Sequence, residues 1–515
     1  MSAPELTRRT VLRASAATVA TGALVSSGVA VAVAGPAGAA AAAPLALSSD
    51  PVLHALRRLT YGPYPGLIAT VRGTGINPWL ESQLQPAKIA DANVDSIIKA
   101  AFPRMLLSSA QIRVRYKDKG WQALQELKGT TIVRAIWSER QLQEVVHGFW
   151  SDHFYTYPID GASFWGKFDE DKRLRANAFT SFGRLLNLSA SSPAMLAYLN
   201  NDKSSEDNIN ENYGRELLEL HTLGLAGGYT ESDVRNAALA MTGWTSDDKT
   251  LAFKYDPKMH YNGALKVLGW KHPNIDGTAG GIETGQSLLD YLAAHPATAR
   301  HISTKLCRRL VADSPPAALI ASTTKVFLAS KGSVPELLRH IVASREFAAS
   351  AGRKVRRPFD MVTASIRATG GRYRTSQGKQ GGFDLLWPLS EMGHSPFGWI
   401  DPNGYPDTAE SWLSSVGVLG RWNTSIAIAG NWFKGIDMLD AKALAGGKDR
   451  PAKAGPLVDA LTLALTGQRF AKAHRNAIVE YLDASESTII DDNTLGWRGP
   501  RIIALILASP YLQVR

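Results

Sequence analysis

Cysteine is almost absent from this chain, since Cys307 is the only one among 515 residues. A single cysteine cannot form an intramolecular disulfide, and the sequence contains no CxxC pattern for a metal and no CxxCH pattern for a haem. The folded state must therefore be stabilised by the packing of its core and not by covalent cross-links.

Several common catalytic motifs are missing as well. The sequence has no GxGxxG after a strand-like run, no Walker loop, no GxSxG elbow and no HExxH pair. The paired glycines Gly227-Gly228 and Gly280-Gly281 are typical of turns and lack the flanking residues of a phosphate-binding loop. Nucleotide-dependent reactions and serine-triad hydrolysis are therefore disfavoured.

Long apolar runs occur only at the N-terminus. Thr7–Arg13 resembles a twin-arginine motif, residues 14–34 are small or apolar and uncharged, and Ala37-Gly38-Ala39 is suited to cleavage. We predict a signal peptide of the twin-arginine type at residues 1–43, followed by release; a membrane anchor is the alternative. No run of 18 apolar residues follows Pro44, which predicts no transmembrane span in the mature chain.

Acidic residues are fewer than basic ones. The 57 Lys and Arg and 46 Asp and Glu give a net charge of +11, of which the predicted signal region carries +2. This excess suits an acidic polymer, an anionic cell wall or a membrane surface, and it equally suits general solubility. The basic residues form only short runs, at Arg113–Lys117 and Arg353–Arg357, without a nucleic-acid-binding motif. Nucleic acid is therefore not the expected partner.

Helix signals dominate the roughly 470 residues that remain. Apolar residues recur at helical spacing from Thr131 to Phe154, Asp50 before Pro51 is a typical helix start, and Thr230 with Asp233 resembles a capping box. Further helices are expected near residues 79, 286–294, 296–311, 334–347, 358–368, 409–413, 416–433, 456–465, 471–482 and 498–509. We predict an all-α protein, with one large multi-helix domain at residues 44–515 and a small β-hairpin insertion.

The hairpin is expected at Leu251–Leu268. Phe253 and Tyr255 alternate with polar residues, Tyr261-Asn262-Gly263 is prone to turn, and a second strand-like run follows at residues 265–268. Asp256 and His260 would then lie near the hairpin loop. A stretch rich in Gly, Arg, Gln and Ser at residues 371–382 is the expected mobile loop or subdomain joint.

The segment Asn208–Gly224, NINENYGRELLELHTLG, is the most informative part of the chain. On a helix, Asn212, Arg215, Glu216 and Glu219 share one face within an arc of roughly 100°. Its two carboxylates repel each other unless Arg215 pairs with Glu219 and a proton, a cation or another basic residue neutralises Glu216. A buried carboxylate without a partner has a raised pKa, as a general acid requires. The alternatives are a solvated helix face and a buried polar network that only fixes helix packing.

This segment, together with Phe149-Trp150-x-x-His153-Phe154, resembles the signature of a large bacterial family, the domain-of-unknown-function family numbered 1800. Further similar segments are Gly228–Thr230, Ala240–Trp244, Asp256–Gly269, His295–Arg300 and Asp401–Asp407. The resemblance implies an exported, helical protein without an established activity, often encoded beside a second exported protein that resembles sulfatases. Ser151 stands where many relatives place a second histidine, which weakens a metal site that needs both.

Two other groups extend the candidate site. His153 lies in a turn crowded with aromatic residues, where a histidine is more often a hydrogen-bonded core residue than a ligand. With Asp256, His260 and Glu216 it could nevertheless surround a divalent cation. A loop rich in Pro and Gly at residues 401–407 lines a cleft, binds a cation or forms a plain turn, of which the turn is favoured.

The candidate roles are as follows. The predicted catalytic residues are Glu216, Glu219, Asp152 and His153. The predicted substrate-binding residues are Asn212, Arg215, Trp150, Tyr213, Asp401 and Tyr405. The predicted metal ligands are His153, Glu216, Asp256 and His260, with a divalent metal as the candidate cofactor.

Three functions are compatible with these residues. The leading hypothesis is an exported hydrolase that acts on an extracellular polymer such as a polysaccharide, with carboxylates as general acid and base. The alternative is a non-catalytic surface protein that binds a glycan or scaffolds a sulfatase-like exported partner. A metal-dependent oxidoreductase is the third. All three predict a secreted or cell-surface protein.

Overall fold

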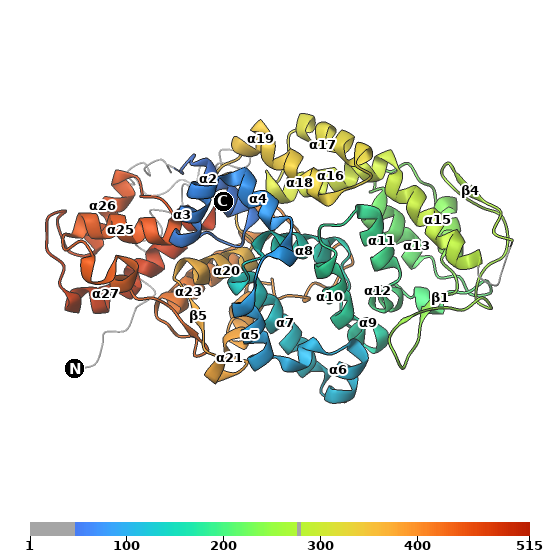
Figure 1. The fold of residues 1–515 in the computed structure, drawn as a ribbon, viewed down its shortest axis with the longest axis horizontal. Coiled ribbons are helices and arrows are strands. Elements are labelled where there is room, and N and C mark those ends of the chain that lie inside the picture. Colours follow the sequence, from blue (N-terminus) through green and yellow to red (C-terminus); the bar gives the residue numbers. More distant parts are fainter. Residues whose placement is uncertain (1–46, 276–279) are drawn as a thin grey trace.

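The computed structural model describes residues 47–275 and 280–515, so the predicted signal peptide lies outside the described residues. Within that part of the chain, helices make up nearly all of the regular structure (Figure 1), which confirms the all-α prediction. In the same residues, no helix is long and apolar enough to cross a membrane.

The helices have the following bounds. The first part of the chain forms α2 (Pro51–Leu59), α3 (Pro65–Thr74), α4 (Ile76–Gln83), α5 (Ala92–Ala101), α6 (Ser109–Tyr116), α7 (Gly120–Trp137), α8 (Gln141–His153), α9 (Gly161–Trp165), α10 (Lys167–Ala176), α11 (Phe182–Ala190), α12 (Pro193–Tyr198), α13 (Asn212–Glu216) and α14 (Glu231–Ala240). The second part forms α15 (Gly280–Ala294), α16 (Pro296–Leu310), α17 (Ala317–Ala329), α18 (Val334–Ala343), α19 (Arg345–Ala348), α20 (Pro358–Ala368), α21 (Gln380–Phe383), α22 (Leu386–Glu391), α23 (Ser415–Ala429), α24 (Ala441–Leu444), α25 (Ala454–Thr466), α26 (Lys472–Tyr481), α27 (Asp492–Ala508) and α28 (Pro510–Gln513). Short 3₁₀ helices are η1 (Pro86–Lys88), η2 (Pro103–Leu106), η3 (Asn201–Lys203), η5 (Thr375–Gln377), η6 (Ala409–Trp412) and η7 (Gly447–Asp449), and η4 (Leu217–Thr222) is a π-helix.

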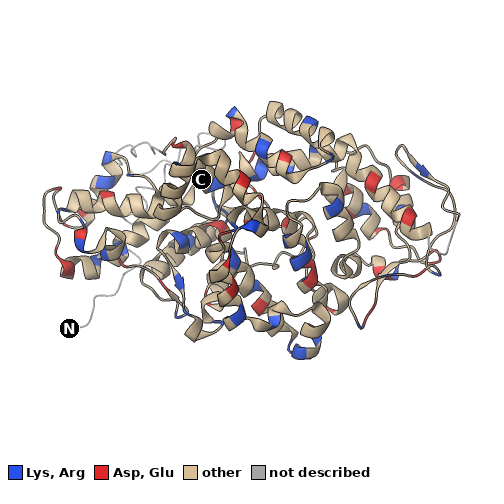
Figure 2. Cartoon of the chain, in the orientation of Figure 1, with Lys and Arg blue, Asp and Glu red and all other residues tan. Residues whose placement is uncertain are grey.

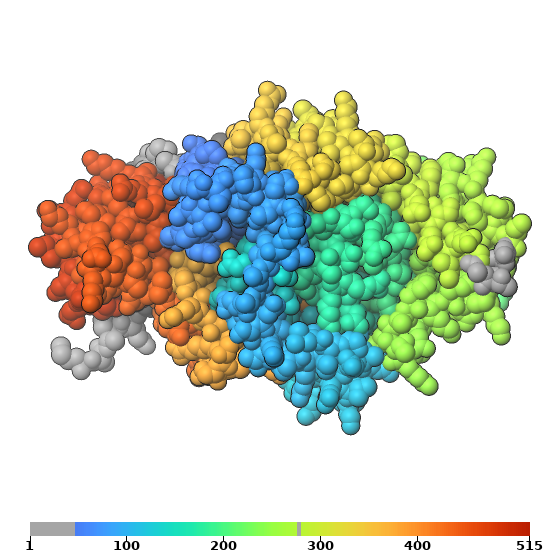
Figure 3. Space-filling model, in the orientation of Figure 1, coloured from blue at the N-terminus to red at the C-terminus, as the bar shows by residue number. Residues whose placement is uncertain are grey.

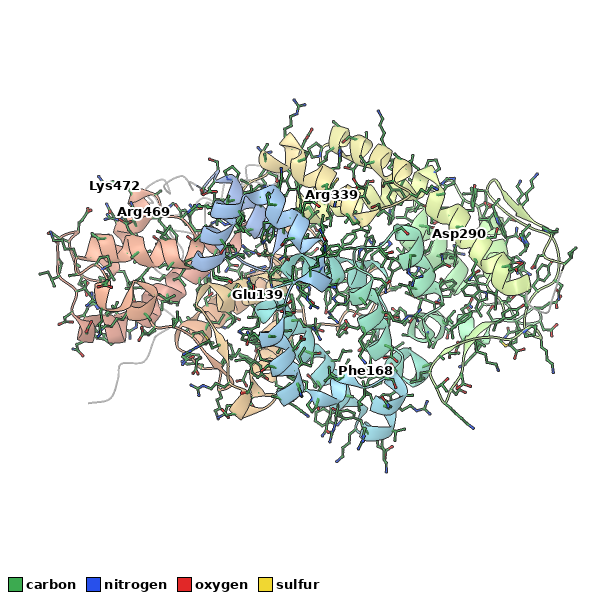
Figure 4. All side chains as sticks on the ribbon, in the orientation of Figure 1. Glu139, Phe168, Asp290, Arg339, Arg469 and Lys472 are labelled. Carbon is green, nitrogen blue, oxygen red and sulfur yellow. The ribbon has the colours of Figure 1, made fainter. Side chains whose placement is uncertain are left out.

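The apolar spacing predicted one continuous helix from Thr131 to Phe154. This prediction is wrong, because α7 ends at Trp137 and α8 begins at Gln141. Asp91 stabilises the break by accepting hydrogen bonds from the Ser138 hydroxyl at 2.7 Å and the Glu139 backbone N–H at 2.8 Å. Glu139, labelled in Figure 4, lies at this bend between the two helices. A tertiary contact from a distant carboxylate therefore ends a helix that the local apolar pattern would continue.

The described residues form two large hydrophobic cores and a small cluster of Tyr155, Tyr405 and Trp412. The first core gathers buried residues of α2–α4, α11–α18 and most of α8, and the second gathers those of α5–α7, α20 and α22–α28. The inner helix α8 contributes to both, because Val146 and Trp150 belong to the first core and Val145 to the second. In Figure 1 the C-terminal helices and the α11–α15 group lie at opposite ends of an elongated molecule, with α7, α8 and α20 between them.

The N-terminal helices lie between the C-terminal helices and the middle of the chain and contact the C-terminal helices. Figure 3 shows them, in blue, crossing the visible face between the red C-terminal helices and the green middle of the chain. On α2, the Arg57 guanidinium donates to the carbonyl of Thr466 at the end of α25 at 2.8 Å. Acidic and basic side chains are interspersed along the described chain (Figure 2), so the basic excess is spread out.

The β-structure consists of three two-stranded antiparallel sheets among the described residues: β1 (Trp244–Ser246) with β2 (Phe253–Tyr255), β3 (Leu265–Val267) with β4 (Trp270–His272), and β5 (Arg372–Tyr373) with β6 (Ile436–Asp437). A small β insertion is therefore confirmed, but the expected pairing of residues 253–255 with 265–268 is wrong. The turn-prone Tyr261 lies between two hairpins, and its backbone N–H donates to the Thr242 hydroxyl at 2.9 Å.

The glycine-rich stretch at residues 371–382 contains β5, η5 and α21. Its strand pairs with β6, some sixty residues later in the chain, and α21 packs against α7. Gly382 faces Gly129 closely, since an added Cβ would lie 3.1 Å from the Gly129 Cα. This stretch is thus tied to two distant segments, and its role as a subdomain joint stays a prediction.

Candidate active site

The central motif forms α13 and continues as the π-helix η4. The hydroxyl of Thr222 donates at 2.6 Å to the carbonyl of Leu217, five residues earlier, in keeping with the wider π-turn. Gly214 allows close packing, because an added Cβ would lie 2.7 Å from both the Ala238 nitrogen and the Val234 oxygen of α14. A π-turn is rare and often marks a functional site, so the backbone itself distinguishes this segment.

The spacing predicted an ion pair between Arg215 and Glu219, but Arg215 does not form it. Its guanidinium donates two hydrogen bonds to Glu231 at the start of α14, at 3.0 and 2.6 Å. Among the residues that the structure describes, no cation lies within ion-pair distance of Glu216 or Glu219. The two carboxylates of the motif are therefore left without a direct counter-charge.

The environment of Glu216 favours its protonated form. Its side chain is half-buried, and burial raises its pKa; the neighbouring charge of Glu219 raises it further, against a smaller effect of Arg215. Glu219 accepts a hydrogen bond from the Tyr229 hydroxyl at 3.4 Å. A carboxyl group with a raised pKa beside a second carboxylate is the arrangement from which general acids are built.

The loop at residues 401–407 approaches this face through Tyr198, the last residue of α12. The Tyr198 hydroxyl donates to the carbonyl of Ile400 at 2.7 Å. Burial raises the pKa of Tyr198 to about 12, and the charges of Asp401 and Glu216 both contribute to the rise. Asp401 and Glu216, from segments far apart in the sequence, therefore lie on the same side of the molecule, near one tyrosine.

The same loop packs against the end of α8. Gly404 has a φ of +70°, and any side chain there would collide with the backbone of Asp152. Tyr405 is buried, and its hydroxyl donates to the Ser395 carbonyl at 2.6 Å. The partly exposed Trp399 lies 5.4 Å from the Tyr405 ring and donates to the Asn403 side chain at 2.7 Å. Asp152, Tyr405 and Asp401 are thus brought into one region.

Beside this region lies a small, partly open cavity of about 60 Å³. Its polar lining includes Asp152, Tyr405, Arg357, His147 and His394. Asp152 accepts a hydrogen bond from Arg357 at 2.6 Å, and burial nevertheless raises the pKa of Asp152. The cavity is large enough for a few water molecules and too small for a sugar ring. Asp152, whose side chain is 22% exposed, therefore supports the loop and binds Arg357, and its catalytic role stays a prediction.

His153 is a hydrogen-bonded core residue, so the predicted catalytic and metal-binding roles do not fit its surroundings. Its Nε2 lies 3.1 Å from the His221 carbonyl and donates to it, and its Nδ1 accepts from the Lys305 ammonium at 2.9 Å. Burial, followed by the charge of Lys305, holds the pKa of His153 well below its usual range. Both ring nitrogens are occupied, and the imidazole stays neutral.

The predicted metal ligands do not converge. The Nδ1 of His260 donates to the Thr242 carbonyl at 2.8 Å, and its Nε2 lies 2.8 Å from the Asn274 side-chain oxygen. Asp256 accepts the backbone N–H of Lys258 at 3.1 Å, as in a local turn. Across the described chain, no group of three or more His, Cys, Asp or Glu side chains is placed to hold a metal ion. The set of His153, Glu216, Asp256 and His260 is therefore not assembled.

Of three further residues predicted to bind substrate, two are buried and one is exposed. Trp150 is fully buried in the first core and donates to the Ala178 carbonyl at 3.1 Å. Tyr213 is buried as well, and burial raises its pKa. Asn212 is exposed at the first turn of α13, where its backbone N–H donates to the Asn210 side chain. Trp150 and Tyr213 belong to the core, and neither offers a surface to a substrate.

The sequence pattern of a protein family of unknown function, DUF1800, matches residues 54–514, nearly the whole of the described chain. The chain belongs to the DUF1800 family. No curated protein and no solved structure matches it.

Several residues near the candidate site of this DUF1800 protein were not predicted from the sequence. Tyr198, Tyr229 and Glu231 complete the surroundings of the motif carboxylates. Tyr229 and Glu231 lie in or beside segments that the sequence did single out, but no local pattern pairs them with Glu219 and Arg215. The run Arg353–Arg357 was a clearer signal: its lysine and two of its arginines are buried, although it was interpreted only as a short basic run. Three buried cations directly before a helix require carboxylates nearby, and Asp360 lies in the first turn of that helix.

Chemically, the DUF1800 protein presents a half-buried carboxyl group with a raised pKa, a second carboxyl group three residues later, and a third, Asp401, on a facing loop. A phenol, Tyr229, donates a hydrogen bond to Glu219, and a partly exposed indole, Trp399, lies two residues before Asp401 in the sequence. Such a surface can donate a proton, accept a proton and stack against a flat polar ring.

Proposed function

We propose that this DUF1800 protein is an exported hydrolase that cleaves an extracellular polymer, such as a polysaccharide, by carboxylate acid–base catalysis. The observation that carries the proposal is Glu216, a half-buried carboxyl group without a cation partner, whose pKa is raised by burial and by Glu219. Arg215, its direct neighbour in the sequence, is occupied by Glu231 instead. Nothing in the packing of α13 requires an uncompensated carboxyl group, whereas general acid catalysis does.

The proposed step is the hydrolysis of a glycosidic C–O bond. Glu216 transfers its proton to the leaving oxygen as the bond breaks, and Asp401 removes a proton from the water that attacks the sugar carbon. Asp401 suits the second role better than Glu219, because it comes from another segment and can lie on the opposite side of the scissile bond. Glu219 then keeps the pKa of Glu216 high, and Trp399 offers a stacking face for a sugar ring.

Export is part of this proposal and rests on the N-terminal sequence. The twin-arginine-like Thr7–Arg13 and the uncharged run after it would direct the folded protein out of the cell, where polymers are accessible. Folding before export also agrees with a chain whose only cysteine, Cys307, is buried and free. A secreted or cell-surface enzyme is the result.

The test is a release assay on a panel of neutral and acidic polysaccharides, with new reducing ends measured for the purified mature chain. The E216Q variant is expected to lower the rate by about 100-fold or more. The matched control is E486Q, a glutamate beside the C-terminal helices that pairs with Arg475 and whose side chain is 65% exposed, for which we expect little change. Circular dichroism shows that both variants are folded. The proposal fails if E216Q keeps the wild-type rate.

A second candidate function is non-catalytic glycan binding, by which the protein would serve as a surface scaffold for a sulfatase-like exported partner. It is favoured by large exposed aromatic side chains that do not belong to the site above: Trp121, Trp387, Trp432 and Trp497. A polysaccharide that binds to both the wild type and E216Q, and is cleaved by neither, would support this function instead.

A further inference from the structure

An apolar pocket of about 450 Å³ lies between α23 and the end of α27, far along the chain from the carboxylate motif. Its apolar lining includes Leu413, Val418, Leu419, Trp422, Pro510 and Val514. The volume falls within the range of small-molecule sites, and the lining is of the apolar and aromatic kind that such sites have.

The pocket is preformed by regular structure. Val355 forms an antiparallel bridge with Val514, which fixes one wall, and α23 packs along α27 to form another. Leu413 and Leu419 remain 37% and 43% exposed. Apolar side chains gathered around a hollow and left in contact with water favour an apolar ligand.

One charged residue lines this apolar pocket. Arg421 is only 3% exposed, and its guanidinium donates to the Gln513 side chain and to the Arg356 carbonyl, both at 2.7 Å. Its Nε has no hydrogen-bond partner, and no carboxylate of the described residues lies within ion-pair distance. Burial lowers the pKa of Arg421 only to about 10, so it stays charged at neutral pH.

A buried cation without a counter-charge is unfavourable, and an anion placed beside it relieves the cost. The residues directly around Arg421 do not supply that anion, because both of its acceptors are neutral oxygens. The charge of Asp360 favours the cation only from beyond ion-pair distance. A fully polar anion would satisfy the charge but would leave the apolar walls exposed to water. A ligand with one acidic end and a hydrocarbon body meets both requirements.

We propose that this pocket binds an apolar monocarboxylate, such as a medium-chain fatty acid, with its carboxylate toward Arg421 and its hydrocarbon chain along Leu419, Trp422 and Val514. The site is separate from Glu216, so the proposal does not depend on hydrolase activity.

The test uses octanoate and octanol as probes, titrated into the mature chain by isothermal titration calorimetry. Octanoate is expected to bind at least about ten times more tightly than octanol, since only the acid can pair with Arg421. In L419W, the indole fills the pocket, and octanoate affinity should fall by about tenfold or more. The matched control is L328W on α17, where the leucine is 42% exposed but lies away from the pocket; its affinity should stay that of the wild type.

A second variant, R421M, tests whether the guanidinium group binds the carboxylate. If it folds, the preference for octanoate over octanol should disappear; if it does not fold, the octanol comparison and L419W decide. Equal binding of the two probes, or unchanged octanoate binding in L419W, overturns the proposal. Light scattering is run on the wild type and L419W, and a dimer that only L419W disrupts would identify the pocket as a self-association surface instead.

Discussion

Two regions of this protein bury carboxyl groups, and the pKa is lowered in one region and raised in the other. In the interior, Asp360 has no exposed surface and receives two hydrogen bonds from Arg309, at 2.9 and 3.1 Å, with Arg357 and Arg515 close by. These cations hold its pKa well below the usual range. On the motif face, Glu216 has no such partner, and its pKa is raised.

The difference separates a structural carboxylate from the one that we propose as the general acid. Arg309 belongs to α16 beside the first core, and Asp360 belongs to α20 in the second, so their ion pair joins the two halves of the molecule. A carboxylate satisfied in this way stays ionised and does not transfer protons near neutral pH. Glu216 contributes no such link, and the cation that could have neutralised it, Arg215, is directed to Glu231. The carboxylate that stabilises the fold and the carboxylate of the proposed reaction are thus different residues.

The largest expected effect comes from breaking the interior pair. D360N keeps the size of the side chain but removes the buried negative charge that faces Arg309, Arg357 and Arg515. Asp152 and Asp407 then compensate these buried cations only in part, and we expect a loss of about 3–5 kcal/mol in unfolding free energy. Urea denaturation followed by far-UV circular dichroism measures it.

The matched control is D492N. Asp492 also pairs with two cations, Lys442 and Arg450, at 2.7 and 2.9 Å, but its side chain is 60% exposed. Water screens such pairs, so this variant should unfold at nearly the wild-type urea concentration. Similar midpoints for D360N and D492N would contradict the distinction between the two regions.

A second, smaller effect tests whether His260 is structural. H260A removes the hydrogen bonds to Thr242 and Asn274 and leaves a cavity in a buried position, so we expect a loss of about 2–3 kcal/mol. Elemental analysis of the purified wild type and H260A, prepared without chelator, should show the same metal content. A stable variant that loses a stoichiometric metal would restore the ligand role that the sequence suggested.

A third effect concerns acid. The cations around Asp407, Lys354 first and then Arg309, lower its folded-state pKa below that of the unfolded chain. Its contribution to stability is therefore complete above about pH 4 and is lost as the pH falls further toward the folded-state value. D407N should be less stable than the wild type at neutral pH, and the gap should shrink by roughly 1–2 kcal/mol between about pH 5 and pH 3. A gap independent of pH would show that the ionised form of Asp407 is not the stabilising one.

These contrasts also show what the sequence could predict. Helix content, the start at Asp50, and the capping box of Thr230 and Asp233 follow from local patterns, and all are present. The motif carboxylates were likewise found from their spacing. The partner of Arg215 was not, because Glu231 lies sixteen residues away across a turn and the i+4 rule names only Glu219.

Non-local contacts account for the other errors. Trp150 was predicted to bind substrate, but an aromatic residue at helical spacing fits a core equally well. Only the packing of α8 between two cores places Trp150 in the interior. The histidines were grouped by residue type alone, and nothing local showed that His153 would be held by Lys305, from a helix some 150 residues later.

The smallest expected effect is also the sharpest test of the comparison, because its sign is opposite to that of the interior acids. Because the pKa of Glu216 is raised in the folded state, ionisation of Glu216 lowers the free energy of unfolding. This loss of stability is absent below about pH 4, where Glu216 is protonated in both the folded and the unfolded state. It grows as the pH rises through the folded-state pKa. E216Q removes this penalty. Since half of the side chain meets water, we expect E216Q to gain only about a few tenths of a kcal/mol at neutral pH and nothing at about pH 3. Urea unfolding at both pH values measures the gain, and a loss of stability at neutral pH would mean that the Glu216 carboxylate is satisfied by contacts of the kind that hold Asp360.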